Sequence, residues 1–175
     1  DMKMKRQQFL IFAILSVLLI FSTISFGQDE TFANPNADYT FKLPDSKWKM
    51  TVAPSASNPN VEYVFGDRSN GHLEIRKLTV QKSELLTDLI HNTEEQKLQF
   101  LPGFIAGRDE NFRGKLPGVV FNYDYVKASR PMSGRFYYLR ANDTTVYVLR
   151  FSGYQDSMKS LRGDTDSIAR TFSLK

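Results

Sequence analysis

Apolar residues in this sequence recur mainly at every second position, in short runs separated by turn-forming residues. The first run is Tyr39, Phe41 and Leu43, and a second run over residues 48–52 follows it as the other half of an expected hairpin. A period of two is typical of strands with one buried face. The same reading applies to residues 61–65, 73–80, 119–127, 134–141 and 144–152. The chain is therefore restricted to folds built around a β-sheet, and we expect about six strands.

Two stretches change to helical spacing. Over residues 83–101 apolar residues repeat three and four apart, with Ser83 as the expected N-cap and Pro102-Gly103 as the stop. Near the C-terminus Met158, Leu161, Thr165, Ile168 and Phe172 repeat in the same way, although Gly163 weakens this run. The pattern predicts an α+β fold in which helices pack on the faces of an antiparallel sheet.

The first 27 residues have the features of an export signal. Lys3, Lys5 and Arg6 precede an apolar run over residues 9–21, and Ser25-Phe26-Gly27 supplies small residues before a cleavage site. The sequence predicts an exported protein, periplasmic or extracellular, with residues 1–27 as signal peptide.

A retained membrane anchor is the alternative, because residues 9–26 approach the length of a membrane-spanning helix. Four polar residues weaken that interpretation: Ser16, Ser22, Thr23 and Ser25. Contact with a membrane is expected only if this leader stays uncleaved. The chain has no Cys, so it lacks the lipid-attachment residue of bacterial lipoproteins.

Composition indicates one domain without covalent crosslinks. Removal of residues 1–27 leaves 148 residues, which we divide into a flexible lead (28–38) and a domain (39–175). The chain has 23 basic and 19 acidic residues, and the leader contains three of the basic residues and one of the acidic ones. The remaining 20 basic and 18 acidic residues give a net charge of +2. This balance does not indicate nucleic-acid binding. The absence of Cys excludes disulfides, thiol catalysis and thiolate metal sites.

The order of elements resembles the PsbP-like superfamily, which includes the photosystem extrinsic protein, the Ran release factor and the DcrB-type envelope proteins. The residues that carry this resemblance are Tyr39-Thr40-Phe41-Lys42-Leu43-Pro44 with Trp48, Gly71-His72-Leu73-Glu74-Ile75, Gly114 with Leu116-Pro117-Gly118 before Phe121 and Tyr123, Val146-Tyr147-Val148-Leu149-Arg150-Phe151, and Ser167-Ile168 with Thr171-Phe172. The resemblance implies an antiparallel sheet with helices on its faces and a role in binding or assembly. It brings no shared catalytic residues.

Reaction chemistry is not evident in the sequence. His72 and His91 lack the partners of a zinc site, and the acidic pairs at 94–95, 109–110 and 164/166 are interpreted as solvated surface. Ser46 and Lys49 match a serine-lysine spacing, but the companion motifs of that enzyme class are missing. We therefore expect no catalytic residues, metal or cofactor, and the protein is not interpreted as an enzyme.

A group of basic and aromatic residues flanks the run at 119–127 and is the candidate binding region. Arg and Tyr are enriched at binding hot spots. The candidates are Arg113, Lys115, Tyr123, Arg130, Arg135 and Tyr137. Lys159 and Arg162, on the C-terminal helix, are expected to lie outside this region. The alternative interpretation is an ordinary sheet edge protected by charge.

These observations favour an exported, non-enzymatic binding or assembly factor of the cell envelope, with a protein or an anionic envelope polymer as partner. Two alternatives stay open. One is a small-ligand-binding or hydrolytic domain with a cleft between sheet and helix, and the other is a membrane-anchored scaffold with its leader retained.

The leader pattern generates a direct prediction. N-terminal sequencing of the exported protein should find Gln28 as the first residue, because Ser25 and Gly27 provide the small side chains required near the cut. Exported material that still carries Lys3 or Phe9 would show that the leader is retained.

Overall fold

The computed structural model describes residues 30–175, so the expected signal sequence and its cleavage site lie outside the described residues. In chain order the elements are β1 (Glu30–Ala33), β2 (Tyr39–Leu43), β3 (Trp48–Val52), β4 (Val61–Phe65), β5 (Asp67–Thr79), α2 (Leu86–Leu89), the π-helical stretch η1 (Ile90–Glu95), α3 (Gln96–Leu98), β6 (Ile105–Arg113), β7 (Pro117–Lys127), β8 (Arg130–Asn142), β9 (Thr145–Tyr154), α4 (Gln155–Ser160), α5 (Arg162–Thr171) and β10 (Ser173–Leu174).

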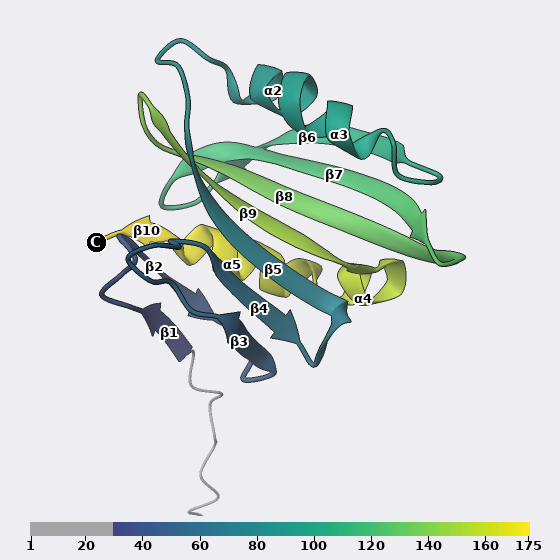
Figure 1. Ribbon diagram of the computed structural model, residues 1–175, viewed down its shortest axis with the longest axis horizontal. Coiled ribbons are helices and arrows are strands. Elements are labelled where there is room, and N and C mark those ends of the chain that lie inside the picture. The colour runs from purple at the N-terminus through teal and green to yellow at the C-terminus, as the bar shows by residue number, and fades with distance from the viewer. Residues whose placement is uncertain (1–29) are drawn as a thin grey trace, which may run out of the picture.

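A twisted antiparallel sheet of seven strands forms the centre of the fold (Figure 1). Its strand order is β3-β4-β5-β9-β8-β7-β6, and a small antiparallel sheet of order β1-β2-β10 lies beside it. The expected α+β class is confirmed, as is the meander of β7, β8 and β9. Within residues 30–175 ten strands form rather than about six, mainly because β1, β6 and β10 carry little apolar alternation.

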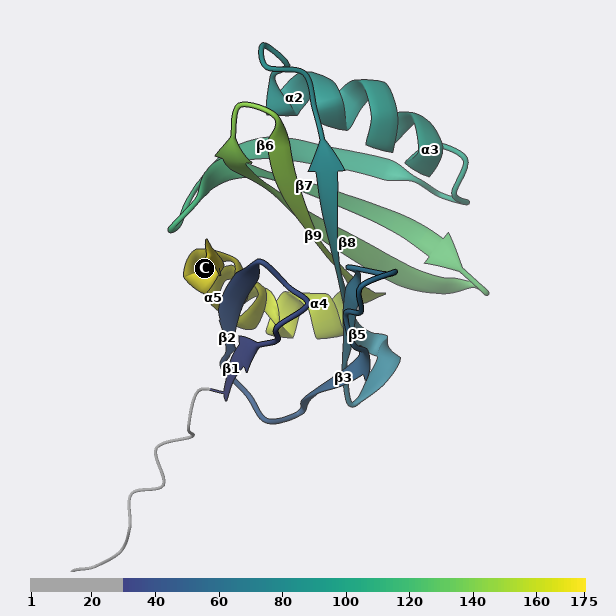
Figure 2. The same cartoon turned by 60° about the vertical axis from the view of Figure 1, so that its left-hand side comes forward.

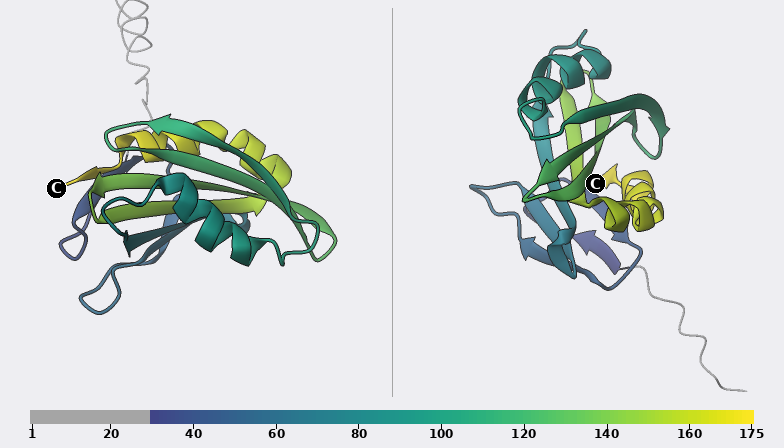
Figure 3. Two further views of the ribbon diagram at one scale, coloured as in Figure 1. Left: turned by 90° about the horizontal axis from the view of Figure 1, so that it is seen from above. Right: turned by 90° about the vertical axis from the view of Figure 1, so that its right-hand side faces the viewer.

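Both faces of the large sheet are covered. The continuous helix α2-η1-α3 packs on one face, and α4, α5 and the small sheet pack on the other (Figures 2 and 3). Strand β8 is buried on both faces. Its Tyr137 and Leu139 belong to one core, and its Phe136 and Tyr138 belong to the other. A strand that is buried on both faces needs a continuous apolar run rather than strict alternation.

The described part of the expected flexible lead is structured. Residues 30–33 form β1, which pairs with β2, and Phe32 packs in the core with its ring centroid 4.8 Å from that of Phe41. Ala37 is also buried. The expectation of flexibility was wrong for residues 30–33. Burial of one aromatic side chain, Phe32, stabilises a short edge strand although its neighbours are polar.

The expected hairpin over residues 39–52 does not form. Strand β2 pairs with β1 and β10 in the small sheet, whereas β3 pairs with β4 at the edge of the large one. Phe41 and Trp48 nevertheless enter the same core, from different sheets. Alternation identified both strands correctly, but it contains no information about which strands pair.

Two further boundaries differ from expectation. Residues 105–113, for which the sequence predicted no strand, form the edge strand β6, in which Phe112 is the only buried residue. The helix begins at Leu86 rather than after a Ser83 cap, and its N-cap residue Leu85 makes no side-chain capping bond. A turn just before it explains the shift, since Glu84 donates its N–H to the Gln81 carbonyl oxygen at 3.1 Å.

The core position of Phe41 and Trp48 yields a stability prediction. Each side chain is 1% exposed, so replacement of either by Ala should lower the free energy of unfolding by about 3–5 kcal/mol. Met50 is a matched control on β3, because its side chain is 41% exposed and its replacement by Ala should cost less than about 1 kcal/mol. Urea unfolding of the three variants measures the difference. Equal losses for Met50→Ala and Trp48→Ala would contradict the packing described here.

Candidate functional site

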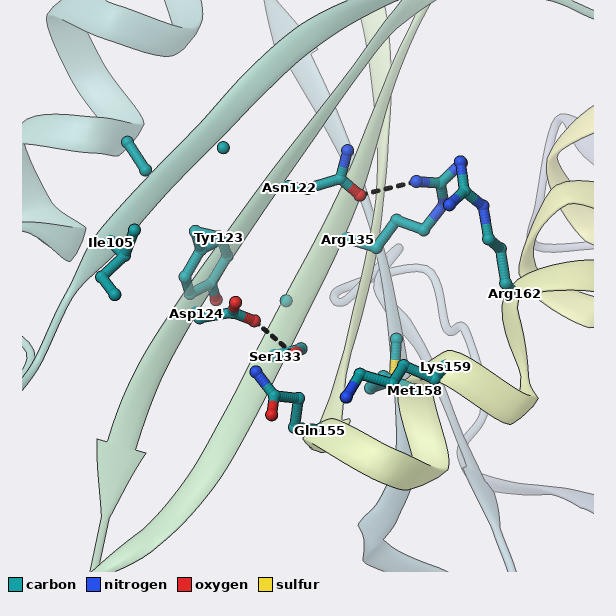
Figure 4. Close-up of a pocket in the computed structure, with 13 residues that line it drawn as sticks. Ile105, Asn122, Tyr123, Asp124, Ser133, Arg135, Gln155, Met158, Lys159 and Arg162 are labelled. Carbon is teal, nitrogen blue, oxygen red and sulfur yellow. Dashed lines mark hydrogen bonds between the residues drawn. The ribbon is translucent and has the colours of Figure 1, made fainter.

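A cavity of about 280 Å³ lies between the large sheet and the C-terminal helices (Figure 4). Its sheet wall comes from neighbouring strands β6, β7 and β8, and its helical wall from α4 and the start of α5. The sheet wall includes Ile105, Gly107, Asn122, Asp124, Ser133 and Arg135. The helical wall consists of Gln155, Met158, Lys159 and Arg162. Segments separated by up to 57 positions in sequence thus meet at one concave site.

Glycines keep the backbones close at this site. A β-bulge interrupts the β6–β7 pairing between Ala106 and Asp109, and a Cβ on Gly107 would lie 2.6 Å from the Asn122 carbonyl oxygen. A Cβ on Gly134 would lie 2.1 Å from the Tyr123 ring, which packs over it on the face that α2-η1-α3 covers. Any other residue at these two positions would push β6 or the Tyr123 ring away from the sheet.

Arg135 is the fixed cation of the cavity. Its Nε donates a hydrogen bond to the Tyr137 hydroxyl at 2.7 Å, Nη1 donates to Oδ1 of Asn122 at 2.6 Å, and Nη2 donates to Oδ1 of Asp166 at 2.9 Å. The residue is only 8% exposed. A buried guanidinium is tolerated where its donors are satisfied and a carboxylate balances its charge.

Asp166 on α5 is the counter-charge of this network. Burial alone would raise its pKa, but hydrogen bonds from Tyr137 and Arg135, with the charges of Arg135 and Arg162, hold the pKa below its usual value. The Tyr137 hydroxyl also lies 3.1 Å from the Thr165 hydroxyl. Strand β8 and helix α5 are therefore joined by a satisfied polar cluster beneath the cavity.

The remaining charges of the cavity are also mostly basic. Arg162 is exposed, and Lys159 has a single ion pair, 3.5 Å from the exposed Asp156. Asp124 is the one acidic residue of the lining, and it accepts a hydrogen bond from the Ser133 hydroxyl. Arg135 is already paired with Asp166, so the charge presented to the cavity comes from the exposed Lys159 and Arg162, and their positive charge favours the binding of an anion at that end.

The six candidate residues named from the sequence do not form one cluster. Arg135 and Tyr123 line the cavity, and Tyr137 lies beneath it. Arg113 and Lys115 lie at the β6–β7 turn, where the Arg113 carbonyl accepts a hydrogen bond from Arg170 at 2.9 Å and the Lys115 N–H donates one to the Arg170 carbonyl oxygen at 3.2 Å.

Arg130 is the first residue of β8 and pairs with Lys127 at the opposite end of β7. Its guanidinium carbon is 3.7 Å from the centroid of the Tyr154 ring, and its Nη1 donates a hydrogen bond to the Tyr154 hydroxyl at 2.7 Å. Strand β7 has eleven residues and spans about 33 Å, so Arg130 and Arg113 are separated by most of the sheet. A partner-binding role for each of these residues remains a prediction, but they do not act as one basic patch.

Lys159 and Arg162 were expected to lie apart from the candidate region, and this was wrong. Both face the same cavity as Arg135 (Figure 4). Helical spacing contained the signal, since Gln155, Met158, Lys159 and Arg162 recur at intervals of three and four on one side of the C-terminal run. What the sequence did not show is that this side faces β8.

Two acidic residues interpreted as solvated instead form ion pairs, and one of them is buried. Asp166 pairs with Arg135, and Glu94, which is 6% exposed, pairs with Arg150 of β9 under the π-helical stretch. The histidines have structural partners. His72 Nε2 lies 2.9 Å from Glu62, and the two ring nitrogens of His91 contact Glu95 and Asp109. Within residues 30–175 no group of three or more His, Cys, Asp or Glu is arranged to hold a metal ion.

No known protein family matches the sequence, and no characterised protein matches it in sequence. Solved structures do match the fold. Cyanobacterial PsbP from Synechocystis sp. PCC 6803 matches with a TM-score of 0.57 and 14% identity, over 88% of this chain and 96% of that protein. LpqN of Mycobacterium tuberculosis, described as involved in cell envelope biogenesis, matches with a TM-score of 0.54 and 13% identity. The match covers 85% of this chain and 92% of LpqN.

A protein of Bacteroides thetaiotaomicron VPI-5482 matches with a TM-score of 0.57 and 11% identity, over 85% of this chain. The chain spans about half the length of that protein, 49%. These likenesses show that the chain has a PsbP-like fold, as its order of elements implied. At such identities the likeness extends to the fold alone. Across residues 30–175 there is no helix with the length and apolar character needed to cross a membrane.

The Arg135–Asp166 contact predicts a pH-dependent stability. Asp166→Asn should lower the free energy of unfolding by about 1.5–3 kcal/mol near neutral pH, because it removes a charge-assisted bond from a buried cation. Since the pKa of Asp166 is lowered by folding, its contribution is complete above the ordinary value of 3.8 and is lost as the pH falls through the folded value.

The matched control is Asp156→Asn, at a residue 97% exposed on α4, which should change stability by less than about 0.5 kcal/mol. Urea unfolding at pH 7 and again at strongly acidic pH measures both. A deficit of Asp166→Asn that persists undiminished in acid would contradict the assignment.

Proposed function

We propose that this protein is a non-enzymatic binding factor of the cell envelope, exported to the periplasm or the cell exterior, and that it holds an anionic group of an envelope component in the cavity between β6–β8 and α4–α5. The observation that carries the proposal is the convergence of Arg135, Lys159 and Arg162 at one concave site. Export is supported by the leader pattern of residues 1–27. An envelope role is supported by the fold shared with LpqN.

The chemistry of the cavity supports binding rather than catalysis. Its polar groups are two guanidinium groups, an ammonium, amides and a hydroxyl-carboxylate pair. Ser133 is hydrogen-bonded to Asp124, and the lining contains no imidazole that would take a proton from the hydroxyl. Lys159 and Arg162 extend from helices packed on the sheet, and their charges attract phosphate or carboxylate.

Small anions test the location of the site. In the protein purified as it matures in its own cells, NMR titration with inorganic phosphate and with acetate at low ionic strength should give saturable shifts at the cavity residues. Lys159→Gln with Arg162→Gln should weaken the binding at least tenfold, which corresponds to the loss of one charge-assisted contact. Added salt should weaken it as well.

The matched control is Arg113→Gln with Lys115→Gln, which removes two charges at the distant β6–β7 turn. This variant should bind phosphate as the unmodified protein does. Shifts centred on Arg113 and Lys115, or the same loss from both double variants, would overturn the proposal.

A further inference from the structure

The two ends of the cavity differ in chemistry. At one end Arg162 and Lys159 extend from the helices, and at the other Ile105 projects from β6 (Figure 4). Ile105 is 66% exposed, which is unusual for a large apolar side chain in a strand. The site therefore combines a cationic end with an apolar end.

A second exposed apolar residue extends the apolar end. Ile105 lies directly opposite Asp124 in the β6–β7 pairing, and Val126 is two residues further along β7. Opposite residues and residues two apart point to the same face of a sheet. Ile105 and Val126 thus lie on the face that carries the cavity, and Val126 is 38% exposed.

The backbone beneath this apolar end is fixed. The Val126 N–H donates a hydrogen bond to the Pro102 carbonyl oxygen at 2.7 Å, and Ile105 and Asp124 are paired in the ladder. The exposure of the two side chains is therefore a feature of paired strands rather than of a chain end.

The middle of the cavity connects the two ends. Met158 of α4 is buried there, and its unbranched thioether side chain adapts to apolar ligands of different shape. Asp124 lies on the opposite wall. Because Asp124 lies across from Ile105 in the β6–β7 pairing, its negative charge repels an anion from the Ile105 end, and an anionic group is stable only at the Lys159 and Arg162 end.

We propose that the cavity binds a single-chain amphiphile with an anionic phosphate or carboxylate head. The head lies at Lys159 and Arg162, and the chain passes over Met158 toward Ile105 and Val126. This inference rests on the proposed function and specifies its ligand class. The volume of about 280 Å³ is near the lower limit of small-molecule sites and accommodates a head and the first part of a chain.

Calorimetry with soluble probes below their micelle concentrations tests the inference. The probes are inorganic phosphate, butyl phosphate and octyl phosphate, with octanoate for a carboxylate head and octyl glucoside for a neutral one. Burial of each methylene strengthens binding by at most about fourfold, so octyl phosphate should bind at least tenfold more tightly than inorganic phosphate. Octyl glucoside should bind far more weakly than octyl phosphate. Tight binding of octanoate would support the inference with a carboxylate head.

Two exposed residues provide matched variants that leave the core intact. Ile105→Ser should weaken octyl phosphate binding about tenfold and leave inorganic phosphate binding unchanged. Leu85→Ser is the control, because Leu85 is 62% exposed at the start of the helix on the other face of the sheet. It should change neither.

The outcomes separate this inference from the function on which it rests. If phosphate binds at the cavity but octyl phosphate binds no more tightly, the amphiphile is wrong and the anion site stands. If no anionic probe binds, both are wrong. If octyl glucoside matches octyl phosphate, or Leu85→Ser is as harmful as Ile105→Ser, the chain adheres to apolar surface in general and the inference is overturned.

Discussion

The ion pair between Arg135 and Asp166 is the contact on which the described site depends. One guanidinium joins β7 through Asn122, β8 through Tyr137 and α5 through Asp166. Burial of this cation is costly without its partners. The position of α5 against the sheet is therefore linked to the charge of Arg135, and the cavity exists where the two surfaces separate next to this contact.

The same contact explains why the site has a positive character despite an almost balanced chain. Asp166 offsets the charge of Arg135 below the cavity, whereas Lys159 and Arg162 face it with little compensation. The fixed network holds the walls and the exposed side chains supply the charge. Binding of a ligand then orders these two side chains but does not have to order the walls.

The period of the apolar residues was sufficient to predict the α+β class and most strands. It did not reveal β1 or β6, because an edge strand such as β6 buries only Phe112. It also did not reveal that Phe41 and Trp48 belong to different sheets. Pairing depends on contacts between segments far apart in the sequence, and alternation within one segment does not encode them.

The candidate site was predictable only in part, for a related reason. The sequence indicates Arg135 only as a basic residue in an aromatic stretch. Its role in joining β8 to α5 depends on Asp166, which is 31 positions away. Lys159 of α4 and Arg162 of α5 lie on one side of the C-terminal run, but the sequence does not show that this side faces β8. Basic residues that are close in the sequence can be far apart in the fold, and the reverse also holds. Arg113 and Arg130, for example, lie at opposite ends of β7.

The cavity between β6–β8 and α4–α5 is proposed as the binding site of this protein. Native mass spectrometry of the protein isolated gently from the envelope of its own cells tests it most directly. The account predicts a bound anionic amphiphile that is lost from Lys159→Gln with Arg162→Gln and retained by Arg113→Gln with Lys115→Gln. Retention of the same ligand by the first double variant, or its loss from the second, would contradict the account.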